Sequence, residues 1–199
     1  MRYFIFFGYD GTNYHGWQIQ PNANSVQQEL QRALSILLRK EIEVVGAGRT
    51  DTGVHARNMA AHFDWNPEEK VSEEKVSEER IPMALDQLVY RLNRILPRDI
   101  AVYEVREVDT EMHARFSATS RTYHYYIHTR KDPFERHYSL QMNYPLDFEK
   151  MNSFFASTAA PAPLSPAPKI TILLNYGNSL CTYGNSCRYY ENYSKNNQQ

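Results

Sequence analysis

The residues best suited to do chemistry stand together at positions 46–58, which read Gly-Ala-Gly-Arg-Thr-Asp-Thr-Gly-Val-His-Ala-Arg-Asn. This segment lies between two stretches with the apolar pattern of strands, residues 41–45 and 60–65. A hairpin connection needs only about two to five residues, so this one is longer and more charged than strand pairing requires. Because long ordered loops often carry binding and catalytic groups, we expect a functional loop here, with Asp51 as its first candidate.

Such a loop needs a scaffold, and the residues before it predict one. Residues 2–9 are nearly all aromatic or aliphatic, which is typical of a strand buried on both faces. A helix then begins after Ser25, because this residue and Gln28 form a capping box. Its apolar positions recur at helical spacing and are Val26, Leu30, Ala33, Leu34, Leu37 and Leu38.

A second helix and a closing strand follow the loop. The helix begins after Pro82, carries leucine, valine and isoleucine on one side, and ends at Pro97. Residues 100–108 then have strand character. The order strand, helix, strand, strand, helix, strand predicts an α+β fold. We expect a split βαβ unit of ferredoxin or RRM type, with a four-stranded antiparallel sheet and helices on one face.

Composition sets wider bounds on the protein. A chain of 199 residues makes one domain or two small ones. The formal charge of -1 argues weakly against nucleic acid, but residues 68–80 hold six Glu against two Lys and one Arg, which leaves the rest net basic. Solvated arginines are still a simpler interpretation than phosphate binding. Two cysteines, no long apolar run and no signal-peptide pattern lead us to expect a reduced, cytoplasmic protein without membrane contact.

The second half of the chain changes character twice. Residues 120–129 form an aromatic strand by propensity, and Asp147 is a candidate N-cap of a third helix. From about residue 153, Pro-Ala alternation gives way to Asn, Tyr and Ser with few charges. Apart from a short apolar run at 171–174, this tail has no pattern that would bury a core, so we expect it to be extended or disordered.

Three stretches between the N-terminus and about residue 152 resemble the TruA-type tRNA pseudouridine synthases. They read Tyr-Asp-Gly-Thr-Asn-Tyr-His-Gly-Trp-Gln-Ile-Gln-Pro at 9–21, Gly-Ala-Gly-Arg-Thr-Asp-Thr-Gly-Val-His-Ala at 46–56, and Met-His-Ala-Arg-Phe-Ser-Ala-Thr-Ser-Arg-Thr-Tyr-His-Tyr-Tyr-Ile at 112–127. The Gly-Arg-Thr-Asp-x-Gly-Val-His core is highly specific. The resemblance implies isomerisation of uridine to pseudouridine in the tRNA anticodon arm, around positions 38–40, without cofactor or metal.

The same resemblance assigns roles to three residues. Asp51 matches the family nucleophile, and whether it attacks the base or the ribose carbon stays open. Its carboxylate must be ionised in a largely dry pocket, where burial alone would raise its pKa, so a cation must oppose that effect. Arg49 matches the family arginine and either holds Asp51 charged or wedges into the stem to support base flipping. Tyr123 matches the tyrosine that stacks on the flipped uracil and serves in proton transfer.

The first of these stretches, residues 9–21 (the first motif), offers weaker candidates for RNA contact. Asp10, Tyr14, Trp17 and Gln18 supply polar groups and aromatic faces that suit RNA backbone or bases. The structural alternative, with Trp17 in the core and Asp10 as a turn former, has equal weight. For His55 a structural role in the loop is the better interpretation.

The histidines and cysteines elsewhere do not predict a metal site. His124 and His128 share one face of a strand without ligand geometry. Cys181 and Cys187 lack a second pair of ligands, so a zinc knuckle is not expected.

The resemblance ends where the family's second domain continues. We find neither its Asp-Phe-Thr-x-Phe-like segment nor its Met-x-Arg-x-x-Val-Gly-like segment, whose arginine pairs with the catalytic aspartate. We therefore expect residues 1–110 to form the catalytic-loop domain, 111–152 an incomplete second domain of the same type, and 153–199 an irregular tail that is an out-of-frame reading or an alternative end. The strand at 120–129 would then lack a partner, and the family's usual homodimer becomes doubtful. A non-catalytic RNA-binding module and an inactive fragment are the alternative functions.

Overall fold

The computed structural model describes residues 1–66, 84–119, 121–143, 147, 150, 168–176 and 179–182. Within it the chain forms two compact units, Met1–Ala118 and Thr119–Gln199. The acidic repeat at 68–80, Pro82 and Cys187 lie outside the described residues. In the described part of the chain, no helix is long and apolar enough to cross a membrane.

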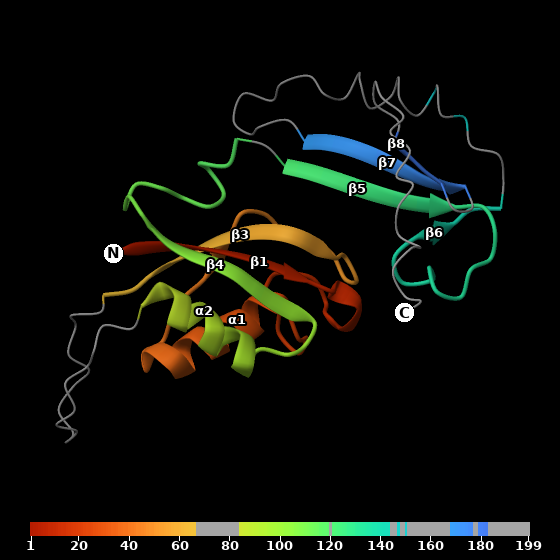
Figure 1. Cartoon of the computed structure of the whole chain (residues 1–199). Helices are drawn as coiled ribbons and strands as arrows, with labels where there is room; N and C mark the ends of the chain where they lie inside the picture. Colours follow the sequence, from red (N-terminus) through yellow and green to blue (C-terminus); the bar gives the residue numbers. More distant parts are fainter. Residues whose placement is uncertain are drawn as a thin grey trace, which may run out of the picture. The chain divides into compact units, whose positions relative to one another are not determined.

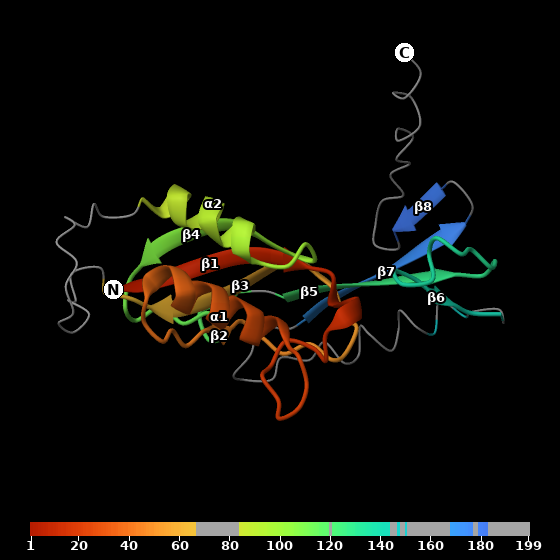
Figure 2. The same cartoon turned by 90° about the horizontal axis from the view of Figure 1, so that it is seen from below.

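The first unit is an antiparallel sheet with two helices packed on one face, as Figures 1 and 2 show. The strands follow the order β2-β3-β1-β4, and both neighbours of β1 run antiparallel to it. This confirms the predicted α+β class and its antiparallel sheet. In chain order the elements are β1 (Arg2–Tyr9), the 3-10 turn η1 (Gly11–Asn13), α1 (Val26–Leu38), β2 (Val45–Gly46), β3 (Ala56–Asp64), α2 (Leu85–Ile95) and β4 (Ile100–Val108).

The core lies between the sheet and the helices. Ile5 and Phe7 of the central strand are fully buried, as are Leu34 of α1 and Leu88 of α2. Each such side chain contributes about 1.5–3 kcal/mol through the apolar surface it removes from water. The expectation that residues 2–9 form a buried strand is therefore confirmed.

Both helices begin and end close to where the sequence predicted. The Ser25 hydroxyl accepts a hydrogen bond from the Gln28 amide at 3.3 Å, which caps α1. The helix stops at Arg39, whose φ of 53° is left-handed. Within α2, the side-chain amide of Asn93 exchanges two hydrogen bonds with the backbone of Val102, at 2.7 and 2.8 Å, and so fixes the helix to β4.

The strand predicted at 41–45 is wrong in extent, because β2 contains only Val45–Gly46. The preceding backbone is satisfied by side chains of α1 instead. The Val44 amide donates to Gln31 Oε1 at 3.1 Å, and the Ile42 amide donates to Ser35 Oγ at 3.0 Å. The next strand, by contrast, begins at Ala56 rather than at residue 60. The loop between these strands is correspondingly shorter at its carboxyl end than we expected.

The second unit contains a four-stranded sheet in the order β6-β5-β7-β8. The strand that we expected to lack a partner pairs in parallel with β7, from Arg121 opposite Pro168 to His128 opposite Asn175. Two strands therefore lie in the stretch that we expected to be irregular, one of them over the apolar run at 171–174. The strands are β5 (Arg121–His128), β6 (Leu140–Gln141), β7 (Pro168–Tyr176) and β8 (Ser179–Thr182).

The predicted third helix is only partly described. The Lys150 amide donates a 3.0 Å hydrogen bond to Asp147 Oδ1, which is the contact expected of an N-cap residue. The body of that helix lies outside the described residues.

Candidate active site

The candidate site begins with a tight turn between β2 and β3. The Val54 amide donates to the carbonyl of Asp51 at 3.2 Å, and Gly53 has a φ of +78°. Glycine suits the third position of such a turn because it has no Cβ to oppose a positive φ. Asp51 is therefore the first residue of a defined turn.

The two principal candidates in this loop, Arg49 and Asp51, are both exposed. The resemblance implied a largely dry pocket around the carboxylate, and the loop by itself does not provide one. Accessibility is still what a nucleophile requires toward a large substrate. The loop presents a carboxylate and a guanidinium two positions apart, on a backbone that its neighbours hold in place.

Thr50, directly before the candidate nucleophile, is anchored twice by the first motif. The Tyr9 hydroxyl lies 2.9 Å from Thr50 Oγ1, and the Trp17 amide donates to the Thr50 carbonyl at 3.2 Å. Gly16 has a φ of +90°, and a Cβ added there would fall on the same carbonyl oxygen. The first two motifs, which are far apart in sequence, therefore meet at Thr50.

Most of the weaker candidates for RNA contact instead help to hold the first motif against the loop. Trp17 is 3% exposed, stacks on Phe7 with ring centroids 5.5 Å apart, and covers Gly46. Tyr14 is buried, and its hydroxyl donates to Asp99 Oδ1 at 2.7 Å. Burial and this carboxylate both raise the pKa of Tyr14. These placements favour a structural role for the two aromatic rings over direct stacking on RNA.

Asp10 shapes the turn that follows β1, while Gln18 is exposed. Asp10 Oδ1 accepts hydrogen bonds from the amide and the hydroxyl of Thr12, at 2.9 and 2.6 Å. This is the turn-forming role that we weighed as the alternative to RNA contact. Gln18 remains accessible to a partner, and its RNA contact stays a prediction.

His55 ties the carboxyl end of the loop to the same motif. Its Nδ1 accepts a hydrogen bond from the Gly11 amide at 3.1 Å and lies 3.0 Å from Asp10 Oδ1. One ring nitrogen cannot serve both neighbours in the same protonation state. Nδ1 accepts from Gly11 when it carries no hydrogen and donates to Asp10 when it carries one. Both arrangements hold the loop against the first motif, which favours the structural interpretation of His55.

Tyr123 belongs to the second unit, where it lies on β5 opposite Ile170 and is 39% exposed. Its role toward the base therefore stays a prediction. On the same strand, His128 is buried and its Nδ1 lies 2.8 Å from Ser139 Oγ. Among the described residues no group of three or more His, Cys, Asp or Glu has an arrangement suited to a metal ion.

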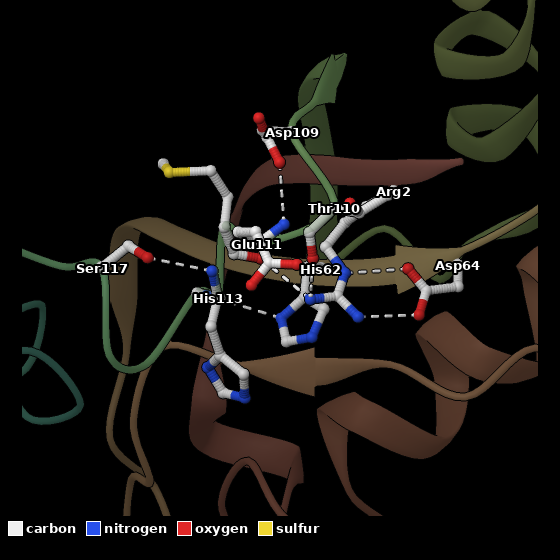
Figure 3. Close-up of polar contacts among 10 residues, drawn as sticks. Arg2, His62, Asp64, Asp109, Thr110, Glu111, His113 and Ser117 are labelled. Atoms are coloured by element: carbon white, nitrogen blue, oxygen red, sulfur yellow. Dashed lines mark hydrogen bonds and ion pairs between the residues drawn. The ribbon is translucent and has the colours of Figure 1, made fainter.

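The sequence did not predict the hydrogen-bond network around Arg2, which Figure 3 shows. Arg2 forms two hydrogen bonds with Asp64, at 2.8 and 2.9 Å, and donates to the carbonyls of Thr110 and Met112 at 2.8 and 3.1 Å. The guanidinium lowers the pKa of Asp64. The start of the chain thus fixes the segment that leads out of β4, which carries the beginning of the third motif.

His62 holds the same segment from β3. It is 4% exposed, and its Nδ1 accepts the Ala114 amide at 3.2 Å. The ring of His113 lies against it with centroids 4.5 Å apart. Burial lowers the pKa of His62, and His113 and Arg2 add to the effect. A histidine inside an apolar strand was the available signal, but sequence alone does not reveal that its partner, Ala114, lies 52 residues further along the chain.

Comparison with known proteins identifies the family of this chain. The fold and the loop define an α+β protein that presents the Asp51 carboxylate on a turn held by hydrogen bonds. Residues 5–117 match the family model described as tRNA pseudouridine synthase. The chain therefore belongs to the tRNA pseudouridine synthase family, which confirms the resemblance that its motifs indicated.

Individual relatives extend the match beyond the first unit. The tRNA pseudouridine synthase A of Bacteroides fragilis is 54% identical over 151 residues, which are 76% of this chain and 55% of that protein. That of Bacteroides thetaiotaomicron is 53% identical over 76% of this chain and 51% of its own length. The tRNA pseudouridine synthase A 1 of Protochlamydia amoebophila is 45% identical over 73% and 52%. The chain thus spans about half the length of the curated relatives it matches.

Proposed function

We propose that this chain is a tRNA pseudouridine synthase that isomerises uridine in the anticodon arm, with Asp51 as its nucleophile. The observation that carries the proposal is the turn of the Gly-Arg-Thr-Asp segment. It exposes the Asp51 side chain while the backbone on either side is hydrogen-bonded to other residues. A carboxylate held in this way is available to a flipped nucleotide without first being ordered.

The chemistry of the isomerisation is balanced within the substrate. The bond between N1 of uracil and C1′ of ribose breaks, the base rotates, and a bond between C5 and C1′ forms. The hydrogen on C5 leaves as a proton, and N1 regains one. No electrons are gained or lost overall, so the proposal invokes no cofactor or metal.

The proposed residues divide this work. Asp51 attacks as a carboxylate, and Arg49 keeps it ionised or supports flipping of the base. Tyr123, carried by the second unit, stacks on the uracil and exchanges a proton with it. We further propose that residues 111–152 belong to an incomplete second domain of the same type as the first, that the protein is cytoplasmic, and that tRNA is its partner. The formation of a homodimer stays an open prediction.

The direct test is tritium release from tRNA labelled at C5 of uridine, using the full chain. Asp51→Asn keeps the size of the side chain but removes its charge. Asp86→Asn, at an exposed position on α2, is the matched control. We expect release by the parent and the control, and at least about a thousandfold less by Asp51→Asn, because a residue of the covalent step is lost.

Three other outcomes would contradict the proposal. Equal release by Asp51→Asn and the control would remove Asp51 as the nucleophile. Anticodon-arm binding without release from any variant would favour the RNA-binding module over an enzyme, and neither binding nor release would favour an inactive fragment.

A further inference from the structure

The bond between Tyr9 and Thr50 has no role in the chemistry derived so far. Tyr9 is the last residue of β1 and is 5% exposed, with its ring stacked on Phe7 at a centroid distance of 6.1 Å. Its hydroxyl crosses to the loop and lies 2.9 Å from Thr50 Oγ1. We propose that Tyr9 is a positioning residue, which acts through Thr50 to fix the backbone that carries the Asp51 carboxylate. This inference rests on the proposed function.

The ring of Tyr9 and its hydroxyl serve different purposes. The ring belongs to the core between sheet and helices, where phenylalanine would fill the same space. The hydroxyl meets Thr50 Oγ1 and, at 3.6 Å, the sulfur of Met59, which is a weak acceptor. Burial raises the pKa of Tyr9, so the hydroxyl stays protonated at neutral pH and remains able to donate. Thr50 is therefore its effective polar partner.

The geometry explains how a bond to Thr50 acts on Asp51. The Thr50 carbonyl belongs to the peptide that joins the two residues, and the Trp17 amide holds it at 3.2 Å. The Tyr9 hydroxyl fixes the other branch of Thr50, its side chain. On the far side of Asp51, the Val54 amide closes the turn. Loss of the hydroxyl leaves the two backbone contacts, so the loop keeps its path but gains freedom at Thr50.

Tyr3 provides a matched control on the same strand. It is also buried, at 3% exposure, and the one hydrogen bond of its hydroxyl within the described residues goes to a sulfur, that of Met1, at 3.4 Å. Tyr3→Phe and Tyr9→Phe remove the same group from the same strand. Only Tyr9→Phe removes a contact with the loop.

The test compares Tyr9→Phe, Thr50→Val, the double variant and Tyr3→Phe in the full chain. In the tritium-release assay we expect kcat to fall about ten- to hundredfold for Tyr9→Phe, with KM within about twofold, because a displaced reacting group costs rate rather than binding. Thr50→Val should give a similar loss and the double variant no further loss, since both remove one interaction. Tyr3→Phe should keep the parental kcat. An unchanged kcat in Tyr9→Phe would overturn the proposal.

A second readout works without turnover. Amide exchange measured by NMR reports on Trp17 and Val54, whose N–H groups are bonded to Thr50 and Asp51. We expect exchange to be about fivefold faster in Tyr9→Phe than in Tyr3→Phe. If the parent protein releases no tritium, the proposed function fails, while the exchange rates still decide whether Tyr9 orders the loop. Equal exchange in the two variants would then overturn the positioning role.

Discussion

Replacement of Gly16 by alanine should distort the candidate active site from outside its own loop. Gly16 has a φ of +90°, and a Cβ there would fall on the carbonyl oxygen of Thr50 and lie 3.2 Å from the carbonyl carbon of Asp51. Both obstacles are backbone atoms, which cannot turn away as a side chain would. The loop must therefore move as a unit to admit one methyl group.

The expected cost has two parts. A residue other than glycine in the left-handed region costs about 1–2 kcal/mol. Displacement of the loop also weakens the 3.2 Å bond from Trp17 to Thr50, and the loss of such a bond costs about 1 kcal/mol. We expect Gly16→Ala to lower the free energy of unfolding by about 2–4 kcal/mol once the steric conflict is included. That is a substantial share of the roughly 5–15 kcal/mol that holds a protein folded.

Urea denaturation followed by tryptophan fluorescence measures this effect, and Gly53→Ala provides the control. Gly53 also has a positive φ, of +78°, but a Cβ there would meet nothing within 4 Å. Gly53→Ala should therefore lower the free energy of unfolding by only about 1–2 kcal/mol, from backbone strain. If Gly16→Ala lost no more stability than Gly53→Ala, the close approach to Thr50 would not exist in solution. Tritium release should fall in Gly16→Ala even under conditions where it is folded.

Three further predictions concern the surroundings of the loop. Gly46→Ala places a Cβ 2.6 Å from the Trp17 ring and should cost about 1–3 kcal/mol in urea denaturation, with altered tryptophan emission. The lowered pKa of His62 means that the unfolded chain binds its proton more readily, so the melting temperature should fall as pH drops below about 6.5, and His62→Gln should flatten that dependence. Ser25→Ala removes the cap of α1 and should lower stability by about 1 kcal/mol in thermal melts, whereas an unchanged melt would mean that the cap is not formed.

The sequence was informative wherever a short-range pattern determined the structure. Helical spacing and the Ser25 cap located α1, and the run of aromatic residues located β1. The Gly-Arg-Thr-Asp motif located the turn that carries Asp51. Each of these signals depends on residues within a few positions of one another.

Contacts between distant segments account for what the sequence missed. Residues 41–44 have the alternation of a strand but are held by Gln31 and Ser35 of α1, which no local pattern reveals. The same reason applies to Arg2 and to His62, whose partners follow β4. For Trp17, RNA contact and a structural role had equal weight, and Gly46, which only the folded chain brings beneath the ring, favours the structural role.

The side chains that replace a longer β2 also affect how the protein behaves in a crowded solution. β2 lies at the edge of the first sheet, where free amides and carbonyls would invite the strand of another molecule. Gln27 donates to the Val44 carbonyl at 2.8 Å, while Gln31 accepts from its amide. A helix therefore supplies the hydrogen bonds that an intruding strand would need to displace. This border of the sheet therefore resists self-association through hydrogen bonds supplied by its own chain.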